Sequence, residues 1–171
     1  KDINTRPLKD LTKESIFNIL AHSNKFTVRL KNSSILDLFS GVGSFGLECL
    51  SRGASNLTFV ENYKNVLPIL KQNISNLNYQ ENSIIIENNI IDDLNFKNFD
   101  KKFDIIFMDP PYKEKRVFSI LMNIFESNIL NQKGIIIIHR HKKEKNIFPE
   151  KFKIIEEKTY GISKVIFGNY L

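Results

Sequence analysis

The chain has 171 residues, of which 42% are hydrophobic and 26% charged, and its net charge is +6. These values are ordinary for one globular domain, and the chain has no run of about 18 apolar residues that would form a transmembrane helix. The single cysteine, Cys49, excludes an internal disulfide and suits a reducing cytoplasm, where we expect the protein. The positive charge favours a polyanionic partner such as nucleic acid, and compositional drift toward lysine explains it equally well.

Two periodicities alternate along the chain. Apolar residues spaced three and four apart indicate helices, and short apolar runs bounded by turn residues indicate buried strands. They predict helices over residues 12–24, 45–51, 66–77 and 117–129, and strands over 34–39, 57–60, 83–87, 103–108, 135–138, 152–159 and 162–167. Because strands alternate with helices, we expect a three-layer α/β fold with a mostly parallel sheet. The last two strands form a C-terminal β-hairpin, and residues 1–171 form one domain.

Some local details follow from the same patterns. Thr12 is expected to be the N-cap of the first helix. In the helix over residues 66–77, one apolar face is predicted to contain Leu67, Leu70, Ile74 and Leu77. Gly134 is expected to separate a helix from the fifth strand, which is apolar on both faces and therefore central in the sheet.

The turn after the first strand has glycine at positions 41, 43 and 46, a G-x-G-x-x-G pattern between a strand and a helix. Glycine permits the tight turn and lets a ligand lie against bare backbone. Glu61 closes the second strand 20 residues after Gly41, where an acid hydrogen-bonds the ribose hydroxyls of an adenosine cofactor. The alternative is a structural turn followed by a surface glutamate.

The type of cofactor follows from residues around this turn. NAD and S-adenosylmethionine sites share the glycines and the ribose acid. Asp37 lies near the end of the first strand. An acid at this place can pair with the ammonium group of an amino-acid cofactor such as S-adenosylmethionine, whereas a dinucleotide needs no acid there. No Gly-Lys-Ser/Thr follows the glycines, which excludes an ATP P-loop. Val42 stands where a nucleophile elbow centred on Ser44 needs glycine.

The fourth strand runs directly into Asp109-Pro110-Pro111-Tyr112. The two prolines end the strand and stiffen the turn. The Asp109 carboxylate and the Pro110 carbonyl can accept both N–H bonds of an exocyclic amine, and Tyr112 can stack on a base. An amine held in this way directs its lone pair at a sulfonium methyl, so the reaction is an in-line displacement that needs no metal. The alternative is a chance turn after a buried strand.

Asp-Pro-Pro-Tyr at this place resembles the motif of amino-methyltransferases, which methylate exocyclic nitrogens of adenine, cytosine or guanine, or a glutamine amide. Thr5-Arg6-Pro7, residues 12–20, residues 36–48 and Ser51-Arg52-Gly53-Ala54 resemble the RsmD family of bacterial small-subunit ribosomal RNA guanine-N2 methyltransferases. The resemblance covers nearly the whole chain. It implies a class I, Rossmann-like methyltransferase fold with a seven-stranded sheet, S-adenosylmethionine as the cofactor, and a guanine in the 16S RNA of the assembling small subunit as the target.

Motifs and resemblance together assign a role to each candidate residue. The amine is expected to be held by Asp109, Pro110, Pro111 and Tyr112. The cofactor is expected to contact Asp37, Phe39, Ser40, Gly41, Gly43, Gly46, Glu61, Asn62, Asn89 and Ile90. Ribosomal RNA is expected to contact Arg6, Lys9, Lys113 and Arg140 through its phosphates. We expect no metal, no membrane contact and a monomer.

The chain departs from the family pattern at three places. The basic Gly/Arg-rich strand pair that usually precedes the Arg-Pro segment is absent from this sequence. Asn89 lies where the family usually has an Asp near the adenine, and its amide can still hydrogen-bond that ring. His139 ends the fifth strand, where the family usually has Glu. His139 and His141 have no cysteine and few acids near them in the sequence, so a zinc site is not expected. We expect both histidines at a strand end, near RNA phosphate.

Two other functions stay open at this point. The same chemistry could act on DNA adenine or on a protein glutamine amide. The chain could also be a nucleotide-binding or RNA-binding module without catalysis.

Overall fold

A computed structural model describes residues 10–90, 92, 94–145 and 147–170. The helices are α1 (Asp10–His22), α2 (Ser44–Ser51), α3 (Leu67–Asn76) and α4 (Val117–Glu126), with short 3₁₀ turns η1 (Gln80–Asn82) and η2 (Phe96–Asn98). The strands are β1 (Ser34–Leu38), β2 (Asn56–Val60), β3 (Ser83–Ile86), β4 (Phe103–Met108), β5 (Leu130–His141), β6 (Phe152–Tyr160) and β7 (Ser163–Tyr170). Arg6 and Lys9, two of the predicted RNA contacts, lie outside the described residues.

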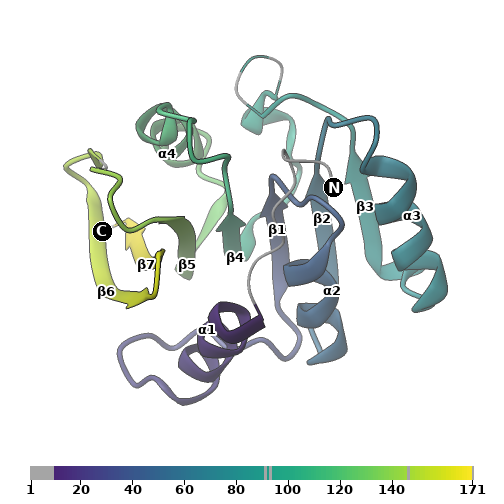
Figure 1. Ribbon diagram of the computed structural model, residues 1–171, viewed down its shortest axis with the longest axis horizontal. Coiled ribbons are helices and arrows are strands. Elements are labelled where there is room, and N and C mark those ends of the chain that lie inside the picture. Colours follow the sequence, from purple (N-terminus) through teal and green to yellow (C-terminus); the bar gives the residue numbers. More distant parts are fainter. Residues whose placement is uncertain (1–9, 91, 93, 146, 171) are drawn as a thin grey trace.

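The strands form one seven-stranded sheet in the order β3-β2-β1-β4-β5-β7-β6 (Figure 1). The first five strands in this order run parallel, and β7 pairs antiparallel with both β5 and β6. The predicted α/β class, the mostly parallel sheet and the C-terminal hairpin are confirmed. The strand order reverses between β1 and β4, and in sheets of this kind ligands bind in the crevice outside the carboxyl ends of those strands.

Helices cover both faces of the sheet, which gives three layers (Figure 1). One core contains buried side chains of α1, α2 and α3, and the other contains those of α4 and η2. Alternate residues of β5 enter opposite cores, with Ile135 and Ile137 in the first and Ile136 and Ile138 in the second. The strand is therefore central, as its apolar sequence predicts.

Local details differ from the sequence-based expectations. Thr12 lies inside α1 and is buried, because the helix already begins at Asp10. Leu77 is 51% exposed, because α3 ends at Asn76 and Leu77 no longer follows its apolar face. Gly134 lies within β5, near the point where the register with β4 shifts, and a Cβ there would come within 2.9 Å of the Asp104 carbonyl oxygen.

Cys49 is a free cysteine that lies buried in the first core, where it packs as a small apolar side chain. In the described part of the chain, no helix combines the length and the apolar character that crossing a bilayer requires.

Candidate active site

The carboxyl ends of β1, β2, β4 and β5 meet at one edge of the sheet. Their aligned residues are Leu38, Val60, Met108 and Ile138. Phe39, Glu61 and Asp109 directly follow the first three of these positions, so predicted site residues from segments far apart in the chain converge. The Asp109 N–H donates to the Leu38 carbonyl at 3.4 Å, which joins the Asp-Pro-Pro-Tyr motif to the end of β1.

Two carboxylates hold the glycine turn between β1 and α2. The Gly41 N–H donates to Glu61 Oε2 at 2.8 Å, and the Gly46 N–H donates to Asp37 Oδ2 at 3.1 Å. Glu61 Oε1 accepts the N–H groups of the next two residues, each at 2.9 Å. The predicted ribose acid is thus fixed by main-chain donors beside the glycines, and its Oε2, which accepts one hydrogen bond among the described residues, retains a lone pair for a hydroxyl.

The glycine turn has the left-handed backbone that the sequence pattern predicts. The angle φ is +60° at Phe39, +55° at Gly41 and +85° at Gly43. A Cβ on Gly43 would lie 2.6 Å from Leu70 Cδ1, whereas no atom of the described residues lies within 4 Å of a Cβ placed on Gly41. Within the described part of the chain, Gly41 therefore presents bare backbone. The Ser40 hydroxyl donates to the Val60 carbonyl at 3.3 Å and helps to hold the start of the turn.

Asp37 is the most unusual carboxyl group of the site. It is 1% exposed, and its Oδ1 has no hydrogen-bond partner among the described residues. Burial raises the pKa of Asp37 well above its ordinary range; the Gly46 N–H opposes this rise, and the charges of Asp109 and Glu61 add to it. A buried carboxyl with one unused oxygen fits a cationic partner. The ammonium group of S-adenosylmethionine is such a partner.

Asp109 lies at the tip of β4 and contacts β5. Its Oδ1 is 2.7 Å from His139 Nδ1, and His139 is 5% exposed. Tyr112 is half-buried, and its ring meets that of His141 edge-on with 5.3 Å between the ring centroids. His139 therefore lies inside the site, against the acceptor carboxylate, and not at a surface where RNA phosphate would reach it.

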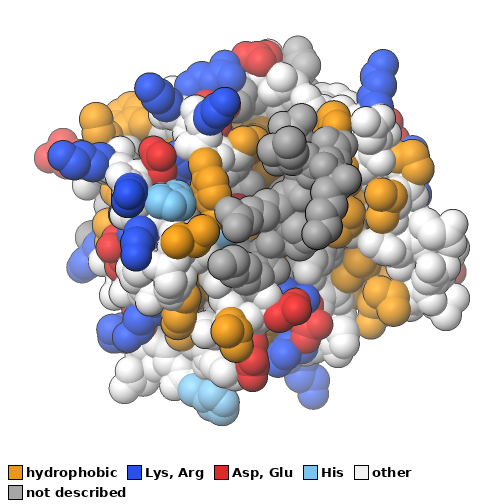
Figure 2. All heavy atoms as spheres, in the orientation of Figure 1, with side chains coloured by type: hydrophobic (Ala, Val, Ile, Leu, Met, Phe, Trp, Pro, Cys, Tyr) orange, Lys and Arg blue, Asp and Glu red, His pale blue; other side chains and the backbone are white. Residues whose placement is uncertain are grey.

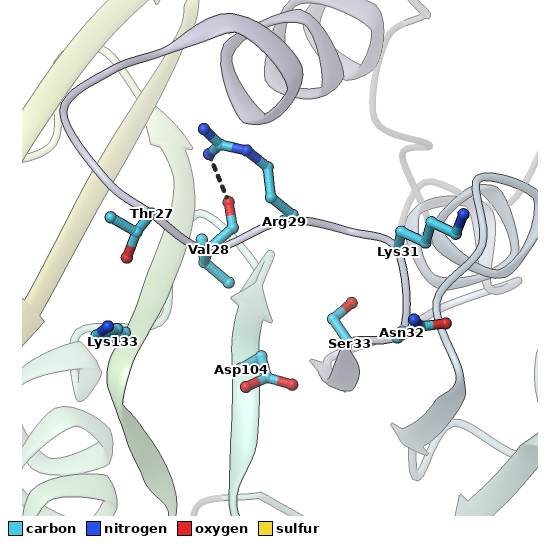
Figure 3. Close-up of a pocket in the computed structure, with 8 residues that line it drawn as sticks. All are labelled: Thr27, Val28, Arg29, Lys31, Asn32, Ser33, Asp104 and Lys133. Atoms are coloured by element: carbon cyan, nitrogen blue, oxygen red, sulfur yellow. Dashed lines mark hydrogen bonds between the residues drawn. The ribbon is translucent and has the colours of Figure 1, made fainter.

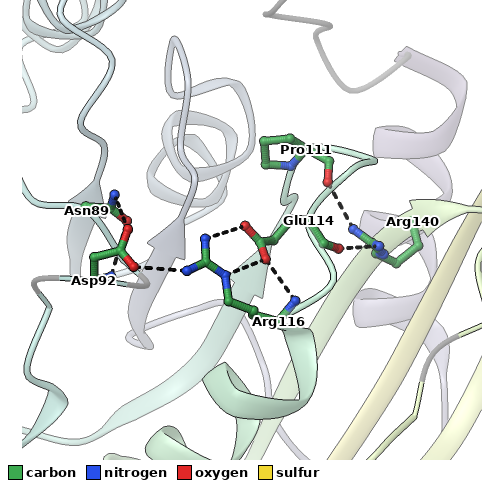
Figure 4. A network of polar contacts seen from close by, with 6 residues as sticks. All are labelled: Asn89, Asp92, Pro111, Glu114, Arg116 and Arg140. Carbon is green, nitrogen blue, oxygen red and sulfur yellow. Dashed lines mark hydrogen bonds and ion pairs between the residues drawn. The ribbon is translucent and has the colours of Figure 1, made fainter.

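Arg140 holds the segment that follows the motif (Figure 4). Its Nη1 donates to the Pro111 carbonyl at 3.2 Å, and its Nη2 donates to the Glu114 carbonyl at 2.8 Å. Arg140 is 1% exposed, and burial lowers the pKa of its guanidinium. This burial does not fit the predicted contact with RNA, because the guanidinium is enclosed by the protein's own carbonyl groups. Pro110 is buried and Lys113 is exposed, so Lys113 is free to meet a ligand.

The loop after β3 carries the residues predicted near the adenine. Asn89 Nδ2 donates to Asp92 Oδ2 at 2.9 Å, and Ile90 is buried. Arg116 Nη1 lies 2.9 Å from Asp92 Oδ1, and Arg116 Nε lies 3.0 Å from Glu114 Oε1. Figure 4 shows that these contacts form a polar chain from the loop after β3 to the loop after β4. Of the other predicted cofactor residues, Asn62 is exposed after β2.

A separate hollow lies at the opposite, amino edge of the sheet (Figure 3). It is lined by Thr27, Val28, Arg29, Lys31, Asn32, Ser33, Asp104 and Lys133. The Asp104 carboxylate in it already accepts the Ser34 N–H at 2.8 Å and the Asn131 amide at 2.7 Å. None of the predicted site residues lines this hollow. Within the described ranges, no three side chains of His, Cys, Asp or Glu are grouped to hold a metal ion.

The roles of His139 and Arg140 at the motif were missed from the sequence. Their contacts join residues 26 to 30 positions apart. No local pattern indicates such contacts, since they depend on β5 lying beside β4. The only available signal was that both polar residues directly follow a strongly apolar strand.

Comparisons with known proteins cover almost the whole chain. The family model described as Conserved hypothetical protein 95 matches residues 1–169. Ribosomal RNA small subunit methyltransferase D of Haemophilus influenzae is 34% identical over 158 residues, which cover 92% of this chain and 79% of that protein. The protein of the same name from Buchnera aphidicola subsp. Acyrthosiphon pisum is 34% identical over 155 residues, which cover 91% of this chain and 77% of that protein.

Solved structures show the same architecture. A Haemophilus influenzae protein described as a candidate methylase superimposes with a TM-score of 0.76 at 30% identity, covering 95% of this chain and 98% of that one. An Escherichia coli protein described as a candidate methyltransferase gives a TM-score of 0.79 over 98% of this chain and 89% of that one. Its identity of 24% supports the fold alone.

Proposed function

The chain belongs to the RsmD family of ribosomal RNA small subunit methyltransferases, and we propose that it methylates the exocyclic N2 amine of a guanine in that RNA. Members of this family are S-adenosylmethionine-dependent enzymes, and the chain has their α/β fold. The observation that carries the proposal is the position of Asp109, at a strand tip hydrogen-bonded to the end of β1, where the glycine turn begins.

The cofactor half of the proposed site consists of residues at the carboxyl ends of β1, β2 and β3 and in the loops that follow them. Asp37 would pair with the ammonium group, Gly41 would leave backbone free for contact, and Glu61 would bind the ribose hydroxyls. Asn89 and Ile90 would contact the adenine. When bound, S-adenosylmethionine supplies a methyl group on a positively charged sulfur. Among the described residues, Asp37 Oδ1 has no hydrogen-bond partner and no atom lies within 4 Å of a Cβ placed on Gly41, and both observations support this assignment.

The acceptor half consists of Asp109, Pro110, Pro111 and Tyr112. The Asp109 carboxylate and the Pro110 carbonyl would accept the two N–H bonds of the amine. These acceptors favour a tetrahedral nitrogen whose lone pair is directed at the methyl group. Tyr112 would stack on the guanine, which must leave its helical stack to reach the strand tip.

The RNA would lie across the basic surface near this edge. In Figure 2, Lys and Arg side chains gather over the side of the molecule that carries α4 and the β5–β7 strands. Exposed lysines that follow the carboxyl ends of β4 and β5 include Lys113, Lys115, Lys142, Lys143 and Lys145. Phosphate contacts of this kind make RNA binding weaken steeply with salt. RNA contacts by Arg6 and Lys9 remain predictions. A monomeric state and a cytoplasmic location with the small subunit also remain predictions.

The test is methyl transfer from labelled S-adenosylmethionine to small subunits isolated from cells that lack this methylation, followed by mapping of the modified nucleotide. We expect one labelled guanine, carrying the methyl group on N2. Free small-subunit RNA, DNA containing adenine and a glutamine-containing protein substrate serve as parallel acceptors. No transfer to RNA beside an active family member, or label on adenine or glutamine instead, would overturn the proposal. Binding of RNA without binding of S-adenosylmethionine would indicate a non-catalytic module.

A further inference from the structure

We propose that His139 is a positioning residue that fixes the Asp109 carboxylate for the acceptor amine, an inference that rests on the proposed function. The two side chains come from neighbouring parallel strands. Met108 is paired with Ile138 in the register of β4 and β5, so the residues that follow them lie side by side. His139 Nδ1 and Asp109 Oδ1 are 2.7 Å apart, and the side chains are 6% and 20% exposed.

The contact leaves one oxygen of the carboxylate for the substrate. A carboxylate only accepts hydrogen bonds, so with Asp109 ionised the hydrogen lies on His139 Nδ1, which donates to Oδ1. Among the described residues, no other side chain or main-chain N–H donates to the Asp109 carboxylate. Its Oδ2 is therefore the oxygen that would accept an N–H of the amine. Fixing Oδ1 fixes the direction of Oδ2, because the carboxylate is planar.

The other nitrogen of the imidazole argues against a role in packing alone. His139 Nε2 is buried and has no hydrogen-bond partner among the described residues. A buried, unpaired polar atom destabilises the fold, and an apolar side chain at this position would avoid that cost. A histidine at this position is therefore explained by its Nδ1, which forms the hydrogen bond with Asp109.

The other groups around the pair leave the orientation of Asp109 to His139. Arg140 donates to the carbonyl groups of Pro111 and Glu114. Asp37 on β1 is itself an acceptor, which takes the Gly46 N–H. Loss of the His139 donor would therefore release the direction in which the Asp109 carboxylate points.

The experiment compares two amides that differ only in where they place their N–H group. Asn carries its NH₂ on Cγ, where imidazole carries Nδ1, whereas Gln carries it one carbon farther out. We expect His139→Gln to lower kcat for RNA methylation by about ten- to a hundredfold, the range for losing a hydrogen bond to a charged group. We expect His139→Asn to recover most of that loss. The Kd for S-adenosylmethionine should stay within about twofold of wild type in both variants.

The split between turnover and cofactor binding separates positioning from a purely structural role. A positioning role lowers kcat in His139→Gln and leaves the melting temperature and the Kd for S-adenosylmethionine close to wild type. His22→Asn is the control, since His22 is an exposed histidine in the last turn of α1, and its kcat should match wild type. Equal kcat in His139→Gln and wild type would overturn the inference. Equal losses in Asn and Gln variants, with lowered melting temperature and weaker cofactor binding, would also overturn it. An inactive wild-type protein would instead refute the proposed function.

Discussion

The two halves of the candidate site are held in different ways. In the cofactor half, glycine backbone and main-chain N–H groups bind the carboxylates of Asp37 and Glu61. In the acceptor half, the buried side chains of His139 and Arg140 hold the Asp-Pro-Pro-Tyr segment from the neighbouring strand. A backbone-built half needs glycine at fixed spacing and leaves a motif in the sequence. A half built from remote side chains depends on strand order and leaves none.

The sharpest way to test this division is to remove the acceptor carboxylate. Asp109→Ala should lower kcat by about 10²- to 10³-fold, comparable with the removal of one preorganised group that stabilises transition-state charge. Calorimetric titration should show S-adenosylmethionine binding unchanged within about twofold, because Asp109 belongs to the other half. Asp100→Ala, an exposed carboxylate before β4, is the control and should behave as wild type. A matching loss of cofactor affinity in Asp109→Ala would show that the halves are not separate.

The reciprocal change removes the predicted ribose acid. Glu61→Gln should weaken S-adenosylmethionine binding by about ten- to a hundredfold, since charged hydrogen bonds to hydroxyls are lost and the amide presents only one acceptor oxygen. At saturating cofactor, kcat should change far less. Glu87→Gln is the matched control, because Glu87 follows the next strand and pairs with Lys71. If the Kd for S-adenosylmethionine is the same in Glu61→Gln, Glu87→Gln and wild type, then Glu61 does not contact the ribose.

Asp37 predicts a pH dependence within the cofactor half. Because burial raises its pKa in the folded chain, the protonated form is favoured there. Its contribution to the free energy of unfolding is therefore complete at low pH and is lost as pH rises through the raised pKa. An ammonium group needs the carboxylate form, so cofactor affinity should rise with pH, by at most about tenfold per unit for one proton.

Asp37→Asn isolates this effect. The variant should bind S-adenosylmethionine more weakly at neutral pH and lose most of the pH dependence, both in calorimetric titrations and in denaturant unfolding. Wild-type affinity that stays flat or falls as pH rises would contradict pairing between Asp37 and the ammonium group.

The difference between the halves also explains what the sequence could predict. Residues such as Gly43 and Gly46 are needed whatever surrounds them, so the turn, its strand and its helix follow from spacing. The two ends of β5 were not predicted, because polar residues such as Asn131 and His139 are typical of the loops that connect secondary-structure elements. The strand is in fact 12 residues long, and its polar end is where it contacts the motif. Arg140 was assigned to RNA because an arginine next to basic residues reads as a surface cation, and only the strand order shows the carbonyl groups that enclose it.

The smallest effect is expected where the halves touch each other. Asp92, in the loop after β3, and Arg116, in the loop after β4, form an ion pair at 2.9 Å, and their side chains are 57% and 52% exposed. Exposed pairs of this kind are screened by water and salt, so Asp92→Asn and Arg116→Gln should each change kcat and cofactor affinity by less than about threefold. The Glu48–Arg52 ion pair at the C-terminal end of α2 serves as the control for a general charge effect.

A double-mutant cycle over Asp92 and Arg116 then measures the coupling between the halves. If the halves are independent, the effects of the two substitutions on cofactor affinity and on kcat combine multiplicatively, within about twofold. A larger coupling that disappears at high salt would show that this ion pair transmits cofactor binding to the acceptor loop. The polar chain in Figure 4 would then be a functional connection between two separately built half-sites.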